Sequence, residues 1–97
     1  MKDLFEKQGG KLRGKMLELA RDIRELYKDD PRGVLSSDVV KWGTENYYVS
    51  ALRASCLLAE RGYLRRLTEE EVLHNYGHQL GQGVWIPTGL LMQADLR

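Results

Sequence analysis

The sequence contains one cysteine and two histidines, side chains that can bind metals or act as nucleophiles: Cys56, His74 and His78. Because the two histidines are four residues apart, a helix would place them on one face, where they could bind a metal ion. Glu70 and Glu71 are near enough in sequence to be further ligands. A histidine pair at this spacing is a weak signal by itself, so we expect two surface or interface histidines and no metal site.

No other spacing in the sequence matches a signature of catalysis. A glycine-rich phosphate loop, a nucleophile elbow and a pair of catalytic carboxylates are not found. Cys56 is predicted on the inner side of a helix, as a small buried apolar residue. We therefore expect no enzymatic activity and no cofactor.

A second group of polar residues has the chemistry of nucleic-acid recognition. Asparagine and arginine form paired hydrogen bonds with base edges, and arginine and lysine neutralise phosphates. The candidate DNA-binding residues are Lys41, Asn46, Tyr47, Ser50, Arg53, Arg65 and Arg66. Each is also an ordinary surface side chain, so the hypothesis depends on the elements that present them.

One helix organises these residues, and we predict that it runs from about Tyr47 to about Arg61. Asn46 is a favourable N-cap, and Gly62 suits the left-handed residue that ends a helix. One face is predicted to be buried: Tyr48, Ala51, Leu52, Ser55, Cys56, Leu58 and Ala59. The opposite face is predicted to be presented to a ligand: Asn46, Ser50, Arg53, Leu57 and Arg61.

Two further helices are predicted before this one. An amphipathic helix spans residues 11–28, and a short helix spans residues 38–42, with Ser36 or Ser37 as its N-cap and Gly43 in the turn that follows. Side chains from all three helices are predicted to form the core: Leu19, Ile23, Leu26, Val40, Leu52 and Leu58.

The sequence after Leu67 predicts a helical or irregular insertion, followed by a returning strand. Thr68 to Glu71 is a capping-box sequence, which favours a helix that ends near Gly77. Residues 84–86 are β-rich and are expected to pair with residues 63–67, and Pro87 is expected to end that strand. Thr88 is then predicted to cap a last helix over residues 89–96, in which the apolar surplus is a candidate dimer contact: Leu90, Leu91 and Met92.

Two segments carry a family resemblance: GVLSSDVV at residues 33–40, and LAERGYLRR at residues 58–66. Together they resemble the winged helix-turn-helix superfamily of small bacterial and archaeal DNA-binding regulators. In that superfamily a helix opening on Ser or Thr precedes the recognition helix, which is followed by a glycine, two apolar residues and basic residues leading into the wing. The resemblance implies DNA binding, although many winged helices bind proteins instead.

We therefore predict a mainly α fold with a small β-hairpin, a winged helix-turn-helix with a three-helix core, a wing and a C-terminal helix. Residues 1–10 are expected to be a flexible arm before a single domain over residues 11–97. Composition is ordinary, with 42% hydrophobic and 30% charged residues in 97 and a net charge of +1. At this size a homodimer would add stability.

The sequence also bears on location. No apolar run approaches the length of a membrane span, residues 1–10 lack the apolar core of a signal peptide, and a lone cysteine fits a reducing compartment, so we expect a cytoplasmic protein.

The predicted function is sequence-specific binding of double-stranded DNA, as in a small transcriptional regulator. The helix over residues 47–61 would enter the major groove, and the basic strand over residues 63–67 would contact the backbone. The alternative is a winged-helix module that binds a protein, because Leu57 lies on the presented face and the helix starts with two tyrosines. A continuous positive strip over the helix and wing would favour DNA, and an apolar or acidic one would favour protein.

Overall fold

Five helices and a three-stranded antiparallel sheet make up residues 11–96, the part of the chain that the computed structural model describes. In chain order the elements are α2 (Gly14–Asp29), β1 (Val34–Leu35), α3 (Ser36–Glu45), α4 (Ala51–Glu60), β2 (Leu64–Arg66), α5 (Glu69–Tyr76), β3 (Val84–Pro87) and α6 (Gly89–Met92). The prediction of a mainly helical fold with a small sheet is confirmed. The predicted arm over residues 1–10 lies outside the described residues.

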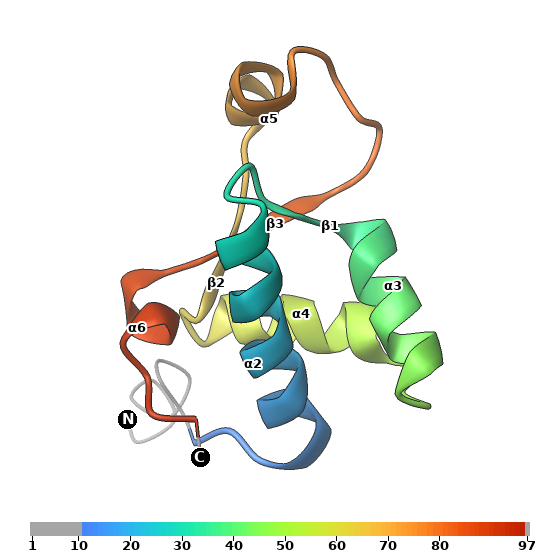
Figure 1. The fold of residues 1–97 in the computed structure, drawn as a ribbon, viewed down its shortest axis with the longest axis vertical. Coiled ribbons are helices and arrows are strands. Elements are labelled where there is room, and N and C mark those ends of the chain that lie inside the picture. The colour runs from blue at the N-terminus through green and yellow to red at the C-terminus, as the bar shows by residue number, and fades with distance from the viewer. Residues whose placement is uncertain (1–10, 97) are drawn as a thin grey trace.

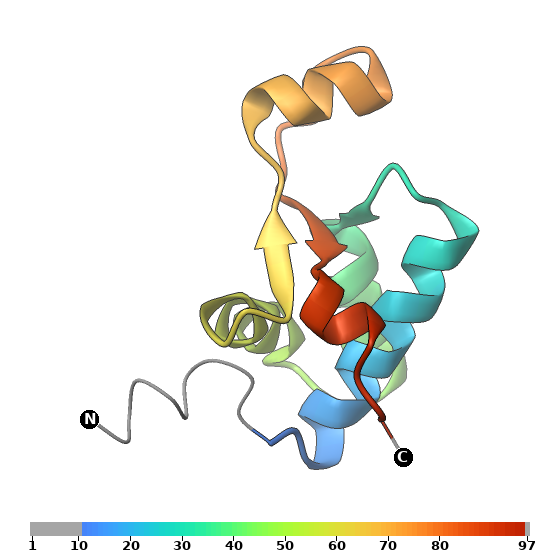
Figure 2. The same cartoon turned by 90° about the vertical axis from the view of Figure 1, so that its left-hand side faces the viewer.

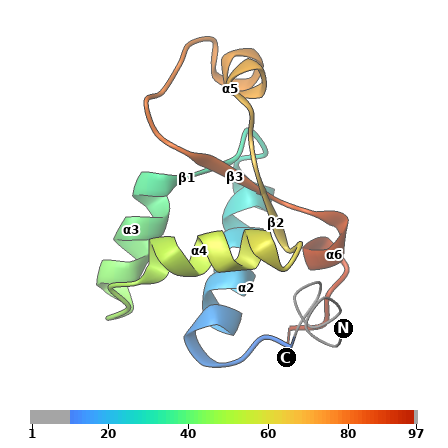
Figure 3. The ribbon, with the colours of Figure 1, turned by 180° about the vertical axis from the view of Figure 1, so that it is seen from behind.

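Helices α2, α3 and α4 pack around one core, with α4 crossing α2 (Figures 1 and 3). Leu19, Ile23 and Leu58 are fully buried, as predicted. The other three predicted core residues are exposed, Leu26 and Leu52 by 38% and Val40 by 51%. Leu52 lies outside the buried face of α4, which consists of Ala51, Ala54, Ser55 and Leu58. Leu26 borders the groove between α2 and α3, and Val40 borders the hollow between α3 and α4.

The boundary between α3 and α4 differs from the prediction. Gly43 lies inside α3 instead of in the turn, and the turn is residues 46–50. Asn46 ends α3 instead of capping α4, because its side-chain amide donates to the Trp42 carbonyl at 2.9 Å. Tyr47 has φ of 55°, a left-handed conformation that no helix continues through, so α4 begins four residues later than predicted.

The sheet has the strand order β1-β3-β2. Strand β3 pairs with β2 in the predicted antiparallel arrangement, with Arg65 opposite Ile86. The third strand, β1, was not predicted and pairs Val34 with Trp85. The hydroxyl of Ser36 donates to the Gly83 carbonyl instead of capping α3, and the side chain of Gln82 accepts from the Ser37 N–H.

Helix α5 confirms the capping-box prediction. It lies in the connection from β2 to β3, beyond the end of the sheet where β2 ends and β3 begins (Figure 2). Its N-cap Thr68 accepts from the Glu71 N–H, and Gly77 ends the helix with φ of 82°. The last helix, α6, is a single turn and is shorter than predicted. The Thr88 hydroxyl donates to the Gly62 carbonyl rather than capping α6, and Leu91 is fully buried in the core.

Among the described residues, no helix has the length and apolar character that crossing a bilayer requires.

Candidate interaction surface

The turn between α3 and α4 presents two large apolar side chains to solvent. Tyr47 is 95% exposed and Val49 is completely exposed. Tyr48, between them, points inward and makes an edge-to-face contact with Trp42, with ring centroids 6.3 Å apart. The inward turn of Tyr48 and the left-handed backbone at Tyr47 together hold the exposed pair in place.

The outer face of α4 is also only weakly polar. Leu52 and Leu57 are each 38% exposed, and Cys56 lies between them on the surface. The prediction that Cys56 is buried is therefore wrong, because the buried face of α4 is centred on Ala51, Ala54, Ser55 and Leu58. In the view from behind, α4 lies on the near side of the molecule, in front of α2 (Figure 3).

We call the combined region the turn–α4 surface. Its residues are Val40, Tyr47, Val49, Ser50, Leu52, Arg53, Cys56, Leu57 and Glu60. It contains five of the nine large apolar side chains that are exposed in the described part of the chain. Val40, Val49 and Leu52 border a shallow hollow of about 170 Å³ between α3 and α4. An apolar concentration of this kind is typical of a binding surface.

The charges on this surface cancel. Arg53 is the basic residue of the turn–α4 surface and Glu60 is its acidic residue, whereas Arg61, predicted on the same face, is partly buried at the C-cap of α4. Of the predicted DNA-binding residues, Tyr47, Ser50 and Arg53 are exposed here. The Asn46 side chain is not available for a base contact in the same way, because its amide donates to the Trp42 carbonyl at the end of α3.

The predicted wing arginines have different environments. Arg65 forms a two-pronged ion pair with Glu71 at the start of α5, with N–O distances of 2.7 and 2.8 Å. Arg66 is exposed, lies 5.9 Å from the centre of the Trp85 ring, and has no ion pair within residues 11–96. Thus Arg66 can meet a phosphate directly, whereas Arg65 would first have to leave Glu71.

The ion pair of Arg65 predicts a pH dependence. The Arg65 guanidinium and the Thr68 backbone N–H lower the pKa of the Glu71 carboxyl to about 2. A lowered folded-state pKa means that the pair stabilises the fold above the ordinary carboxyl pKa, and that this stabilisation is lost as the pH falls toward 2. We expect Arg65→Gln to return the Glu71 pKa toward its ordinary value in a carboxyl NMR titration.

Arg66→Gln is the matched control for that titration and should leave the Glu71 pKa unchanged, since Arg66 does not contact Glu71. Titration of the unmodified protein's Glu71 in the ordinary carboxyl range would mean that the ion pair does not form in solution.

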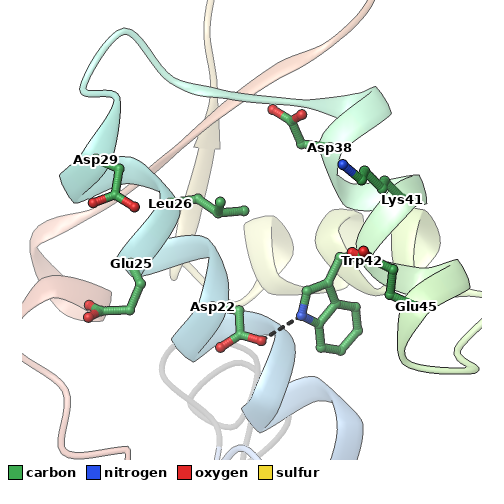
Figure 4. Close-up of a pocket in the computed structure, with 8 residues that line it drawn as sticks. All are labelled: Asp22, Glu25, Leu26, Asp29, Asp38, Lys41, Trp42 and Glu45. Atoms are coloured by element: carbon green, nitrogen blue, oxygen red, sulfur yellow. Dashed lines mark hydrogen bonds between the residues drawn. The ribbon is translucent and has the colours of Figure 1, made fainter.

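Lys41 lies apart from the other predicted DNA contacts. It lines a groove of about 330 Å³ between α2 and α3 (Figure 4). The other lining residues are Asp22, Glu25, Leu26, Asp29, Asp38, Trp42 and Glu45, so five of the eight are acidic. The Trp42 indole donates to the Asp22 carboxylate at 2.6 Å. Five carboxylates repel phosphate, so Lys41 is poorly placed to contact DNA.

The two histidines do not share a helix face. His74 lies on α5, but His78 follows Gly77, where the helix has already ended. Within residues 11–96, no group of three or more histidine, cysteine, aspartate or glutamate side chains is arranged to hold a metal ion.

Some contributing residues had no signal in the sequence. Val40 was predicted in the core but is exposed on α3, and Val49 is exposed in the turn before α4. Arg24 also has no signal in the sequence, and its guanidinium donates to the Leu91 and Ala94 carbonyls and holds the C-terminal segment against α2.

Comparison with known proteins assigns no relative, because no family model, curated protein or solved structure matches the chain.

Proposed function

We propose that this chain is a winged helix-turn-helix domain. The order of the elements supports this: α3, a turn, α4, then the antiparallel strands β2 and β3, with α2 packed behind. In this interpretation β2 and β3 form the wing, and α5 is an insertion at its tip. Helix α4 takes the position of the recognition helix.

We propose further that the turn–α4 surface binds a protein. The observation that carries this proposal is the exposure of Tyr47, Val49 and Val40 beside half-buried Leu52 and Leu57. A helix that reads bases presents polar side chains, whereas the core of a protein interface is apolar and rich in aromatic residues. The three acidic residues that open α5, Glu69 to Glu71, add negative charge where a DNA-binding wing needs positive charge.

Sequence-specific binding of double-stranded DNA is the second candidate function. The observation in its favour is that Arg53 and Arg66 are exposed and have no ion pair within residues 11–96, with Tyr47 and Ser50 exposed near Arg53. Arg53 would then contact base edges, and Arg66 would contact phosphate.

The reducing compartment that the lone cysteine suggests is consistent with the exposure of Cys56, since an exposed thiol persists where disulfides are not formed. We therefore propose a cytoplasmic location.

Photocross-linking in the native cell tests the protein-binding proposal. A photoreactive phenylalanine analogue replaces Tyr47, which is almost fully exposed and can be changed without loss of packing. We expect a discrete protein adduct, and we expect Val49→Asp to abolish it, because a charge in an apolar contact must be desolvated. Val49→Asp should change stability by no more than about 0.5 kcal/mol, as a surface substitution.

The control carries the same photoreactive group at Leu73, which is 50% exposed on α5 and lies off the turn–α4 surface. It should not give the adduct. A parallel titration uses mixed-sequence DNA at low salt. Binding tighter than about 0.1 mM that Arg53→Ala weakens would overturn the protein-binding proposal in favour of DNA.

A further inference from the structure

We propose that the partner of the turn–α4 surface is a second copy of this chain, paired with the first through antiparallel α4 helices. This inference rests on the proposed protein-binding function and names the partner. Two copies would be related by a two-fold axis, so that one surface patch meets itself. The patch must then be complementary to itself.

The charges on α4 have this self-complementarity. Arg53 and Glu60 lie on the outer face, seven residues apart, or about 10.5 Å along the helix axis. That separation is too long for a direct ion pair, and neither residue forms one within residues 11–96. In an antiparallel pair, Arg53 of each copy lies opposite Glu60 of the other, which makes two ion pairs.

The same charges exclude the parallel arrangement. Parallel helices related by a two-fold axis place Arg53 against Arg53 and Glu60 against Glu60. Like charges across an interface are unfavourable. The charge pattern therefore selects one orientation of the two helices.

The centre of the contact follows from the same geometry. The midpoint between Arg53 and Glu60 falls between Cys56 and Leu57, so Cys56 of each copy lies beside the axis, level with Leu57 of the other copy. Positions 53, 56 and 60 follow the alternating three- and four-residue spacing of a helix–helix seam. Leu52 and Leu57, each 38% exposed, would complete their burial at the edges of the seam.

The proposed contact places the dimer interface on α4 instead of on the last helix, α6, where the sequence suggested it. The surplus of apolar residues in α6 is smaller than the sequence indicates, because Leu91 is fully buried and only Leu90 and Met92 are exposed. The turn–α4 surface contains more exposed apolar residues. A contact between two ten-residue helices buries less area than a standard interface, which covers about 800 Å² per partner. We therefore expect a dissociation constant on the order of tens of micromolar.

Charge reversal with rescue tests the arrangement by sedimentation velocity over a range of concentrations. Arg53→Glu and Glu60→Arg should each weaken the homodimer at least tenfold, because each places like charges across the axis. An equimolar mixture of the two single variants should form a heterodimer, and the double variant should recover the homodimer. A purely structural role for either residue would not produce this rescue.

Oxidative cross-linking through Cys56 gives an independent measurement. Mild oxidation should link two copies, because their Cys56 thiols lie beside the axis. The control is Cys56→Ser combined with Lys15→Cys, an exposed position on α2, which should remain unlinked.

A protein that stays monomeric to millimolar concentration would overturn the homodimer. A dimer that is indifferent to both charge reversals would also overturn it, by placing the contact elsewhere. Neither result changes the photocross-linking test, in which an adduct with a different protein would leave the proposed function standing without the homodimer.

Discussion

Leu58→Ala is expected to lower the free energy of unfolding by about 2 to 5 kcal/mol, the usual range for removing a fully buried leucine side chain. Leu58 has no exposed surface and belongs to the cluster that α2, α4 and the sheet share. The surrounding backbone comes from several elements, so the site cannot collapse easily to fill the cavity. Urea unfolding monitored by circular dichroism measures the change.

Leu52→Ala is the matched control, because it makes the same change in the same helix. Leu52 is 38% exposed, and its loss should cost no more than about 1 kcal/mol. Equal costs at the two positions would show that α4 is rotated in solution relative to the structure. A cost at Leu52 that exceeds the cost at Leu58 would move the turn–α4 surface to the other side of the helix.

Among the helices, α5 is the one that a local pattern predicted best. The capping box of Thr68 and Glu71, followed by the left-handed Gly77, placed α5 within one residue. The pairing of β2 with β3 was also predictable, because two β-rich segments flank a single insertion. These features depend on contacts near in sequence, which a pattern can contain.

The features that sequence reasoning missed depend on contacts between distant residues. Gln82 caps α3 from 45 positions away, and β1 exists only because Val34 meets Trp85. The start of α4 was also missed, because Asn46 ends α3 by donating to the Trp42 carbonyl instead of capping α4. An asparagine before an apolar run is also a typical N-cap. The sequence therefore could not decide whether Asn46 ends α3 or caps α4.

The candidate site was also predictable only in part. The exposure of Arg53 and Ser50 was predicted, because both were placed opposite the face predicted to be buried. The engagement of Arg65 by Glu71 and the acidic groove around Lys41 were not, since both need the fold. The net result is a surface with less positive charge than the sequence suggests.

Gly43→Ala is expected to destabilise the fold by about 1 to 3 kcal/mol, although alanine is the better helix former. An added Cβ at Gly43 would lie 2.5 Å from the Tyr48 carbonyl oxygen and 2.9 Å from the Ala51 Cβ. Both atoms belong to backbone or to a short side chain, so relief requires α3 and α4 to move apart. The gain in helix propensity, up to about 1 kcal/mol, offsets only part of that cost.

Gly89→Ala separates the two contributions, because a Cβ there meets no atom within 4 Å. That variant should be neutral or more stable by up to about 1 kcal/mol, through the loss of freedom in the unfolded chain. Gly43→Ala should also shift the amide resonances of residues 47–50, since the Tyr48 carbonyl that must move belongs to the turn. A stabilised Gly43→Ala variant with an unchanged turn would contradict the 2.5 Å approach of the added Cβ to the Tyr48 carbonyl oxygen. It would mean that α3 and α4 are further apart in solution, and the hollow beside Val49 would then be wider as well.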